Sequence, residues 1–153
     1  LNFKFNYYCA CDVSETSVRG SNEYLTYRNL ENKCQVEYKN FFDYSSQEKF
    51  DCIVMGEVLE HVENPIQMLK KIYDLLNIEG KAFITTAINA PTIDHIFLFR
   101  SIEEVLSLVK ESGFKVIDYK CFAAGNRELE KAVKKNMAIS IALILEKDMN
   151  NNI

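Results

Sequence analysis

The segment from Phe50 to Gly56 (FDCIVMG) most constrains the fold, because it is a nearly continuous apolar run that ends at a glycine. An alternating pattern would indicate a strand with one face in solvent, whereas a continuous run is typical of a central parallel strand covered on both faces. Parallel strands need crossover connections, which are usually helices. The run therefore predicts an α/β domain.

The flanking segments supply the other elements of such a domain. Strands are expected at 3–11, 34–38, 81–88, 114–121 and 137–146, and helices at 15–30, 65–76, 102–112 and 126–135. This order predicts a doubly wound, mostly parallel, Rossmann-like sheet with helices on both faces. The last two strands are joined by a short connector, so the final strand is expected to be antiparallel. We expect one domain over residues 1–147 and a disordered tail at 148–153.

The amino-acid composition excludes several classes of binding partner. The formal net charge of −4 and pI of about 5.3 argue against broad attraction to nucleic acid or to an anionic membrane. No apolar stretch approaches the roughly 20 residues that a membrane-spanning helix needs. The five cysteines form no CxxC pair, which argues against a disulfide framework or a zinc cluster and favours a reducing, cytoplasmic setting. A small-molecule substrate is the expected partner.

In an open α/β sheet, ligands lie at the carboxyl ends of the strands. Asp12 closes a predicted strand and could accept hydrogen bonds from the ribose hydroxyls of a nucleoside cofactor. Asp43 could bind the adenine amino group, with Phe42 or Tyr44 against the ring. Either aspartate could instead be an ordinary turn residue.

The segment FDCIVMGEVLEHVENP, with DVSE before it and EGKAFITT after it, resembles the class I S-adenosylmethionine-dependent methyltransferases. The likeness is to the ubiquinone-biosynthesis type of O-methyltransferase and covers about residues 7–121. It implies S-adenosylmethionine as cofactor and methyl transfer to a small-molecule acceptor, with a hydroxyl as the default. It also implies that Asp12 holds the ribose, that Phe42 and Asp43 hold the adenine end, and that Met55, Gly56 and Glu57 line the cleft near the methionine moiety.

The sequence departs from this family at its start. In these enzymes a strand and a glycine-rich GxGxG loop precede the second strand, whereas only 11 residues precede Asp12 here and none is glycine. We therefore expect the first strand to be missing, together with the backbone groups that bind the amino-acid end of the cofactor. A homo-oligomer or a partner chain could cover the strand edge exposed in this way.

A second constellation makes a credible site for a divalent metal such as Mg²⁺. Glu57, Glu60 and His61 stand at i, i+3 and i+4, so one helical turn would place them on one face, and His95 is the only other histidine. The set resembles the metal-dependent small-RNA 2′-O-methyltransferases, which hold an ion with ExxEH and a distant histidine. Alternatively, EVLEH is a turn at the edge of the cleft that binds no metal.

The stretch from Asn89 to Arg100 follows a strand, where a substrate loop is expected. His95 could act as general base on a substrate hydroxyl, because its ordinary pKa lies near neutrality, and Glu57 is the other candidate base. His95 could also be bound only by backbone groups. Three other functions stay open: a non-catalytic binding or oligomerisation module, a metal-dependent RNA 2′-O-methyltransferase, and a nucleotide-binding oxidoreductase, which lacks its GxGxxG fingerprint here.

Overall fold

The computed structural model describes residues 6–149, and the chain divides into two compact units. The amino-terminal unit comprises Leu1–Ser46 and the carboxyl-terminal unit comprises Gln47–Ile153. Each unit is described by itself.

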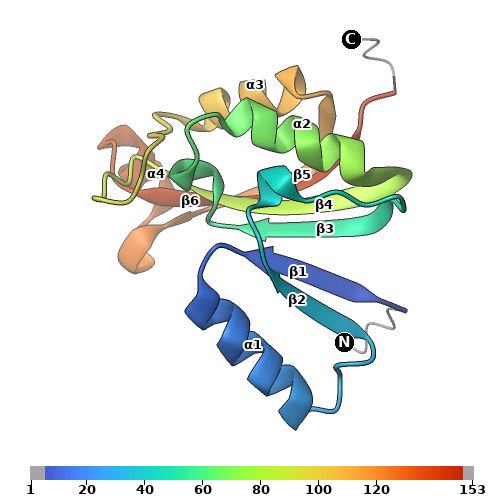
Figure 1. Ribbon diagram of the computed structural model, residues 1–153. Helices are drawn as coiled ribbons and strands as arrows, with labels where there is room; N and C mark the ends of the chain where they lie inside the picture. The colour runs from blue at the N-terminus through green and yellow to red at the C-terminus, as the bar shows by residue number, and fades with distance from the viewer. Residues whose placement is uncertain (1–5, 150–153) are drawn as a thin grey trace. The chain divides into compact units, whose positions relative to one another are not determined.

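The amino-terminal unit contains two parallel strands and a helix (Figure 1). Its elements are β1 (Tyr8–Asp12), α1 (Glu15–Tyr27), β2 (Cys34–Tyr38) and a 3₁₀ turn at Phe41–Asp43. The strands pair in register from Tyr8 opposite Cys34 to Asp12 opposite Tyr38, so their carboxyl ends lie at the same edge. Helix α1 is the crossover that a parallel pair requires.

Local chemistry sets both ends of α1. The Ser14 hydroxyl accepts a hydrogen bond from the Ser17 N–H at 3.2 Å and caps the first turn. At the other end Asn29 is left-handed, with φ of 53°. The N–H groups of Asn29 and Leu30 donate to the carbonyls of Thr26 and Leu25, which is a Schellman motif with asparagine in the place usually taken by glycine. This motif ends the helix at Tyr27, three residues before the predicted end.

The carboxyl-terminal unit is built on a four-stranded sheet in the order β3-β4-β6-β5. Its elements are β3 (Phe50–Gly56), α2 (Pro65–Leu75), β4 (Leu76–Ile88), α3 (Ile102–Glu111), β5 (Phe114–Ala123), α4 (Leu129–Lys134) and β6 (Ile139–Lys147), with 3₁₀ turns at Leu59–His61 and Ala124–Asn126. Strands β3 and β4 are parallel, whereas β6 is antiparallel to both of its neighbours. The predicted α/β fold and its antiparallel final strand are confirmed.

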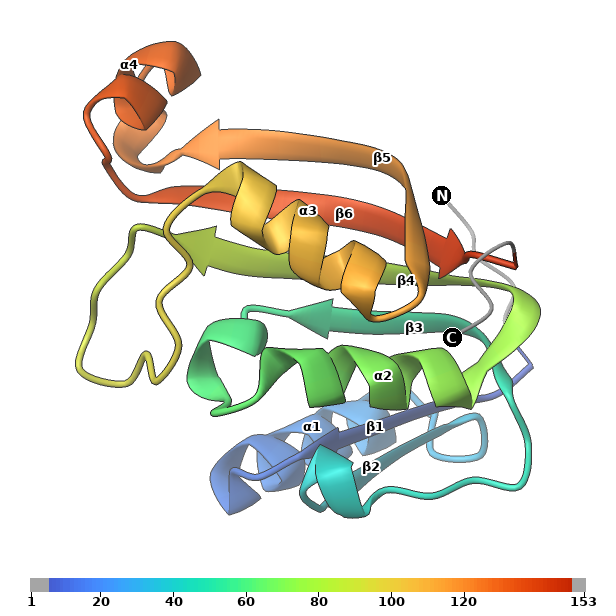
Figure 2. The same cartoon turned by 90° about the horizontal axis from the view of Figure 1, so that it is seen from above.

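Helices α2 and α3 lie side by side on one face of this sheet (Figures 1 and 2). The core between these helices and the sheet contains Ile72, Val105, Ile84 and Leu143, none of which is exposed. Burying one such side chain contributes about 1.5–3 kcal/mol relative to leaving it in water. The core therefore holds β4 and β6 against the two helices.

Strand β4 differs from the prediction, which placed its start at Lys81 after a turn at Glu79-Gly80. Helix α2 ends at Leu75 and the chain becomes extended at once. The extra residues are absorbed by a register shift, since Phe50 pairs with Leu76 but Cys52 already pairs with Lys81. Gly80 lies buried within this irregular segment.

At the carboxyl terminus, the Asp148 N–H donates to the Gly113 carbonyl at 2.9 Å. Met149 is also described, whereas residues 150–153 of the predicted tail lie outside the described residues. The expectation of one domain over 1–147 and that of a missing first strand both stay predictions. Within residues 6–149, no helix has the length and apolar character to cross a membrane.

Replacing Gly80 by alanine should destabilise the carboxyl-terminal unit. An added Cβ would clash with the Leu76 side chain and would lie 2.9 Å from the Phe50 carbonyl oxygen, which belongs to rigid backbone. We expect Gly80→Ala to lower the free energy of unfolding by about 1–3 kcal/mol in urea denaturation followed by circular dichroism.

Gly20→Ala is the matched control, because an added Cβ at Gly20 in α1 meets nothing within 4 Å. A helical alanine should stabilise by about 0.5–1 kcal/mol. Equal stability of the Gly80→Ala variant and the parent chain would contradict the packing described for Gly80.

Candidate functional site

The carboxyl end of β3 turns sharply at Glu57. Glu57 has a left-handed backbone, with φ of 50°, which costs a non-glycine residue about 1–2 kcal/mol. Its N–H donates to the Thr85 carbonyl at 3.0 Å, and this bond holds the strained turn against β4. The 3₁₀ turn begins only at Leu59. Glu57 thus falls outside it, and the expected single helical turn carrying Glu57, Glu60 and His61 does not form.

The turn at Leu59–His61 places the Glu60 carboxyl inside the protein, where the residue is 1% exposed. The Thr86 hydroxyl donates to Glu60 Oε2 at 2.7 Å. Glu60 Oε1 is buried and has no hydrogen-bond partner among the described residues. A buried carboxylate oxygen without a donor is costly, and such orphans concentrate at functional sites.

Backbone hydrogen bonds fix the loop at residues 89–100 beside this carboxyl. The Phe97 N–H donates to the Glu60 carbonyl at 2.9 Å, and the Asn89 N–H donates to the Phe99 carbonyl at 2.9 Å. Ile88 and Phe99 form a further parallel bridge. These contacts bring His95 against His61, with ring centroids 4.8 Å apart and the rings nearly perpendicular.

The Asp94 carbonyl oxygen sets the tautomer of His61. It lies 2.8 Å from His61 Nδ1, and a carbonyl can only accept. Nδ1 therefore carries the proton, and the lone pair of a neutral His61 is on Nε2. A backbone carbonyl that orients an imidazole in this way is the usual support of a metal-binding histidine.

Glu60, His61 and His95 each offer a ligand atom, and these atoms all lie within 4.8 Å of one another. Glu57, the fourth predicted ligand, is not part of this group. Two imidazoles and one carboxylate match the preference of Zn²⁺, Mn²⁺, Fe²⁺ or Co²⁺ better than that of Mg²⁺, which favours oxygen ligands. The donor set therefore suits a transition metal.

The Glu57 carboxyl lies in the electrostatic field of this group. Glu57 is an exposed residue, but the surrounding protein removes part of the water from its carboxyl and so raises its pKa. The hydrogen bond with Thr85 opposes that rise. The negative charge of Glu60 raises the pKa further, whereas His95 lowers it. Glu57 is thus a stronger base than an ordinary glutamate once it is ionised.

In the amino-terminal unit, Asp12 is the last residue of β1, and Asp43 lies in the 3₁₀ turn that follows β2. Asp12 Oδ1 accepts a hydrogen bond from the Ser14 N–H at 2.7 Å. One carboxyl oxygen is therefore used in a turn, as expected if Asp12 is an ordinary turn residue. The Lys39 N–H donates to the Asp12 carbonyl at 3.0 Å and joins the two strand ends. Asn40 then caps the turn that carries Phe42 and Asp43 by accepting from the Phe42 N–H at 3.0 Å.

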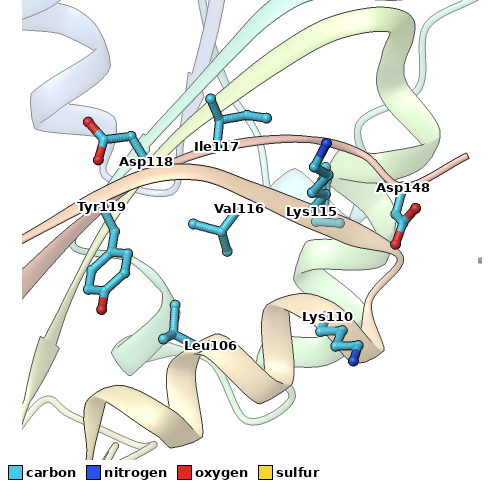
Figure 3. A pocket seen from close by; sticks show the side chains of 9 residues that line it. Leu106, Lys110, Lys115, Val116, Ile117, Asp118, Tyr119 and Asp148 are labelled. Carbon is cyan, nitrogen blue, oxygen red and sulfur yellow. The ribbon is translucent and has the colours of Figure 1, made fainter.

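Two open grooves lie elsewhere on the units. One of about 570 Å³ runs between β1 and α1 and has Asp12 in its lining. The other, of about 490 Å³, lies between α3 and β5 and is lined by Leu106, Lys110, Tyr119 and their neighbours (Figure 3). None of the predicted site residues lines the second groove.

Residues 1–82 match the family described as a methyltransferase domain. This is more than half of the chain, which therefore belongs to that family. The match confirms the resemblance to class I S-adenosylmethionine-dependent methyltransferases that the motifs indicated.

Individual relatives agree with this assignment. The mitochondrial ubiquinone biosynthesis O-methyltransferase of Dictyostelium discoideum is 28% identical over 85 residues, which are 53% of this chain and 26% of that protein. An O-methyltransferase from a Brevibacillus brevis polyketide synthase, solved with S-adenosyl-L-homocysteine, superposes with a TM-score of 0.75 at 14% identity. That superposition covers 94% of this chain and 59% of the other.

An S-adenosylmethionine-dependent methyltransferase from Clostridium acetobutylicum has a TM-score of 0.69 at 10% identity, covering 91% of this chain and 74% of its own. At these identities the structural likeness shows the fold. The chain spans about a quarter of the curated relative and about three fifths of the Brevibacillus protein.

Sequence reasoning missed Thr86, which holds the buried carboxyl of Glu60. We expect Thr86→Val, which keeps the shape but removes the donor, to lower the free energy of unfolding by about 1–3 kcal/mol at neutral pH. Thr86→Ser retains the hydroxyl and should lose less. Equal losses in the two variants, measured by urea denaturation, would show that the hydroxyl does not support Glu60.

Proposed function

We propose that this chain forms part of an S-adenosylmethionine-dependent methyltransferase that methylates a hydroxyl group of a small molecule. The observation that carries the proposal is the group of Glu60, His61 and His95, with the Glu57 carboxyl in its field, just beyond the carboxyl ends of β3 and β4, where α/β sheets bind ligands. Membership of the methyltransferase family supports it. The hydroxyl acceptor is suggested by the O-methyltransferase relatives.

The strand ends of the amino-terminal unit are suited to the nucleoside part of the cofactor. Asp12 is exposed and uses only one carboxyl oxygen in its turn, so the other can accept from ribose hydroxyls. Asp43 would bind the adenine amino group, and Phe42, which is 38% exposed, would pack against the ring. In the other unit, Met55 and Gly56 at the end of β3 would line the methionine side.

S-Adenosylmethionine supplies a methyl group made electrophilic by its sulfonium. Held through Asp12, Asp43 and Phe42, it would supply this methyl group to the acceptor oxygen, and the sulfur would keep the electron pair of the broken carbon–sulfur bond. His95 or Glu57 takes the proton released by the hydroxyl. Most of the rate enhancement comes from holding the two reactants in line in a site from which water is excluded.

Asp12→Ala should weaken cofactor binding. Calorimetric titration of the chain with S-adenosylmethionine should show a dissociation constant raised about 10- to 100-fold, since a hydrogen bond to a charged group contributes about 1.5–3 kcal/mol. Asp118→Ala, an exposed aspartate in β5, is the control and should bind like the parent chain.

Unchanged binding by Asp12→Ala would contradict the ribose assignment. A parent chain that binds no cofactor would favour the alternative of a binding or oligomerisation module. Strand β3 supports a partner in either case, because it is the outermost strand of its sheet and exposes Cys52 and Val54, with Asp51 as its one charged residue. We propose that a partner strand, from another chain or another copy, covers it.

The five free cysteines support a reducing, cytoplasmic setting.

A divalent metal is the second candidate feature of this site, favoured by the orphaned Glu60 Oε1 beside two imidazoles. Glu60, His61 and His95 would hold the ion, which would supply Lewis acidity toward the acceptor hydroxyl. A metal-dependent RNA 2′-O-methyltransferase would need the same group, but the net charge of −4 gives no general attraction for RNA.

Manganese binding tests the metal site without interference from the thiols, which Mn²⁺ avoids. Titration followed by electron paramagnetic resonance should show one bound ion, with affinity reduced about tenfold or more in Glu60→Gln and His95→Ala. Glu103→Gln, at an exposed carboxylate in α3, should leave binding unchanged. Absence of Mn²⁺ binding by the parent chain, together with full methyltransferase activity in EDTA, would remove the metal.

A further inference from the structure

We propose that Cys9 and Cys11 of β1 form a binding site for a soft monovalent metal cation, Cu(I). The site lies in the amino-terminal unit and does not depend on the proposed methyltransferase function. Both thiols are free, and both residues are partly buried.

The two thiols belong to the same face of the β1–β2 pair. Successive side chains of a strand point to opposite faces, so Cys9 and Cys11 share a face. Burial raises the pKa of the Cys11 thiol, and the neighbouring Cys9 raises it further, so the two thiols lie within electrostatic range of each other. Cys34, the other cysteine of this unit, is paired with Tyr8 and therefore belongs to the opposite face.

A connected set of polar side chains holds the surroundings of these thiols in place. Cys9 Sγ lies 3.2 Å from the Tyr44 hydroxyl. The Lys39 ammonium lies 5.7 Å from the centre of the Tyr44 ring and pairs with Glu37 at 3.0 Å. Gln35 Nε2 donates to the other carboxyl oxygen of Glu37 at 2.7 Å. The Tyr44 hydroxyl is thus positioned to donate to a thiolate at Cys9, the kind of support that orients a metal ligand.

The available donor atoms select the metal. Both carboxyl oxygens of Glu37 are used by Gln35 and Lys39, and Asp12 alternates with Cys11 and so belongs to the opposite face. The two histidines of the chain are both in the carboxyl-terminal unit. This face therefore offers two thiolates, whereas structural Zn²⁺ almost always takes four ligands. Cu(I) is a soft cation that thiolates select, and it is stable with two of them.

The charges at the site suit a monovalent cation. Two S–H protons leave as two Cu–S bonds form, and neither copper nor sulfur changes its oxidation state. The carboxylates of Glu37 and Asp12 lie within electrostatic range of Cys11 and attract the incoming cation. The complex with two thiolates carries one net negative charge, which the Lys39 ammonium offsets.

The test is an anaerobic titration of the full chain with Cu(I) in competition with bathocuproine disulfonate, a chelator whose copper complex is coloured. We expect each chain to hold one Cu(I) against the chelator. Cys9→Ser and Cys11→Ser should each weaken binding about 100-fold or more, because a second ligand on the same strand acts at a high effective concentration. Tyr44→Phe keeps both thiols and should weaken binding about tenfold.

Cys52→Ser in β3 and Cys121→Ser in β5 are the matched controls and should bind like the parent chain. X-ray absorption at the copper edge should show sulfur neighbours alone, and this measurement on the parent chain does not depend on how the variants fold. Parent affinity in both Cys9→Ser and Cys11→Ser, or an equal loss in the controls, would overturn the inference. Nitrogen neighbours would place the copper on histidine and would also overturn it.

Discussion

The buried carboxyl of Glu60 is the interaction on which the arrangement of the site depends. Its side chain accepts from Thr86 at the end of β4, and its backbone carbonyl accepts from Phe97 in the following loop. One residue therefore joins the end of β3, the end of β4 and the loop that carries His95. Separating the end of β4 from Glu60 would leave the buried acid without its Thr86 donor, and separating the loop would break the backbone hydrogen bond to Phe97.

That arrangement is costly, and the cost points to a ligand. A carboxylate oxygen with no donor among the described groups destabilises the fold unless a proton, a cation or a substrate group meets it. His61 and His95 are the nearest candidates to complete its surroundings, and the Asp94 carbonyl already orients His61. Glu60, His61 and His95 therefore lie together just beyond the carboxyl ends of β3 and β4.

Much of the fold could be predicted because the apolar pattern and the helix-capping residues indicated the same elements. The run from Phe50 to Gly56 became β3 with the predicted bounds, and Ser14, Asn64 and Ser101 cap their helices through side-chain hydrogen bonds. The early start of β4 could not be predicted, since it depends on how a register shift accommodates Gly80 against another strand. Hydrophobic periodicity contains no information on such a pairing.

The site was predictable in composition and only partly in geometry. With two histidines in the chain, His61 and His95 were the evident partners for Glu60, and the structure brings them together. The helical spacing that added Glu57 failed, because Glu57 adopts a left-handed turn before the 3₁₀ segment begins. Thr86 and the anchoring of the 89–100 loop depend on hydrogen bonds between residues far apart in sequence, for which no local pattern exists.

Amide chemical shifts measured while S-adenosylhomocysteine is added to the full chain test most directly whether the predicted cofactor residues bind this ligand. We expect the largest changes at Asp12, Asp43 and Gly56, all saturating at the same ligand concentration. The amides of Lys115 and Tyr119, beside the groove between α3 and β5, should not move. Changes confined to that groove, or unchanged shifts at Asp12 and Gly56, would contradict the assignment.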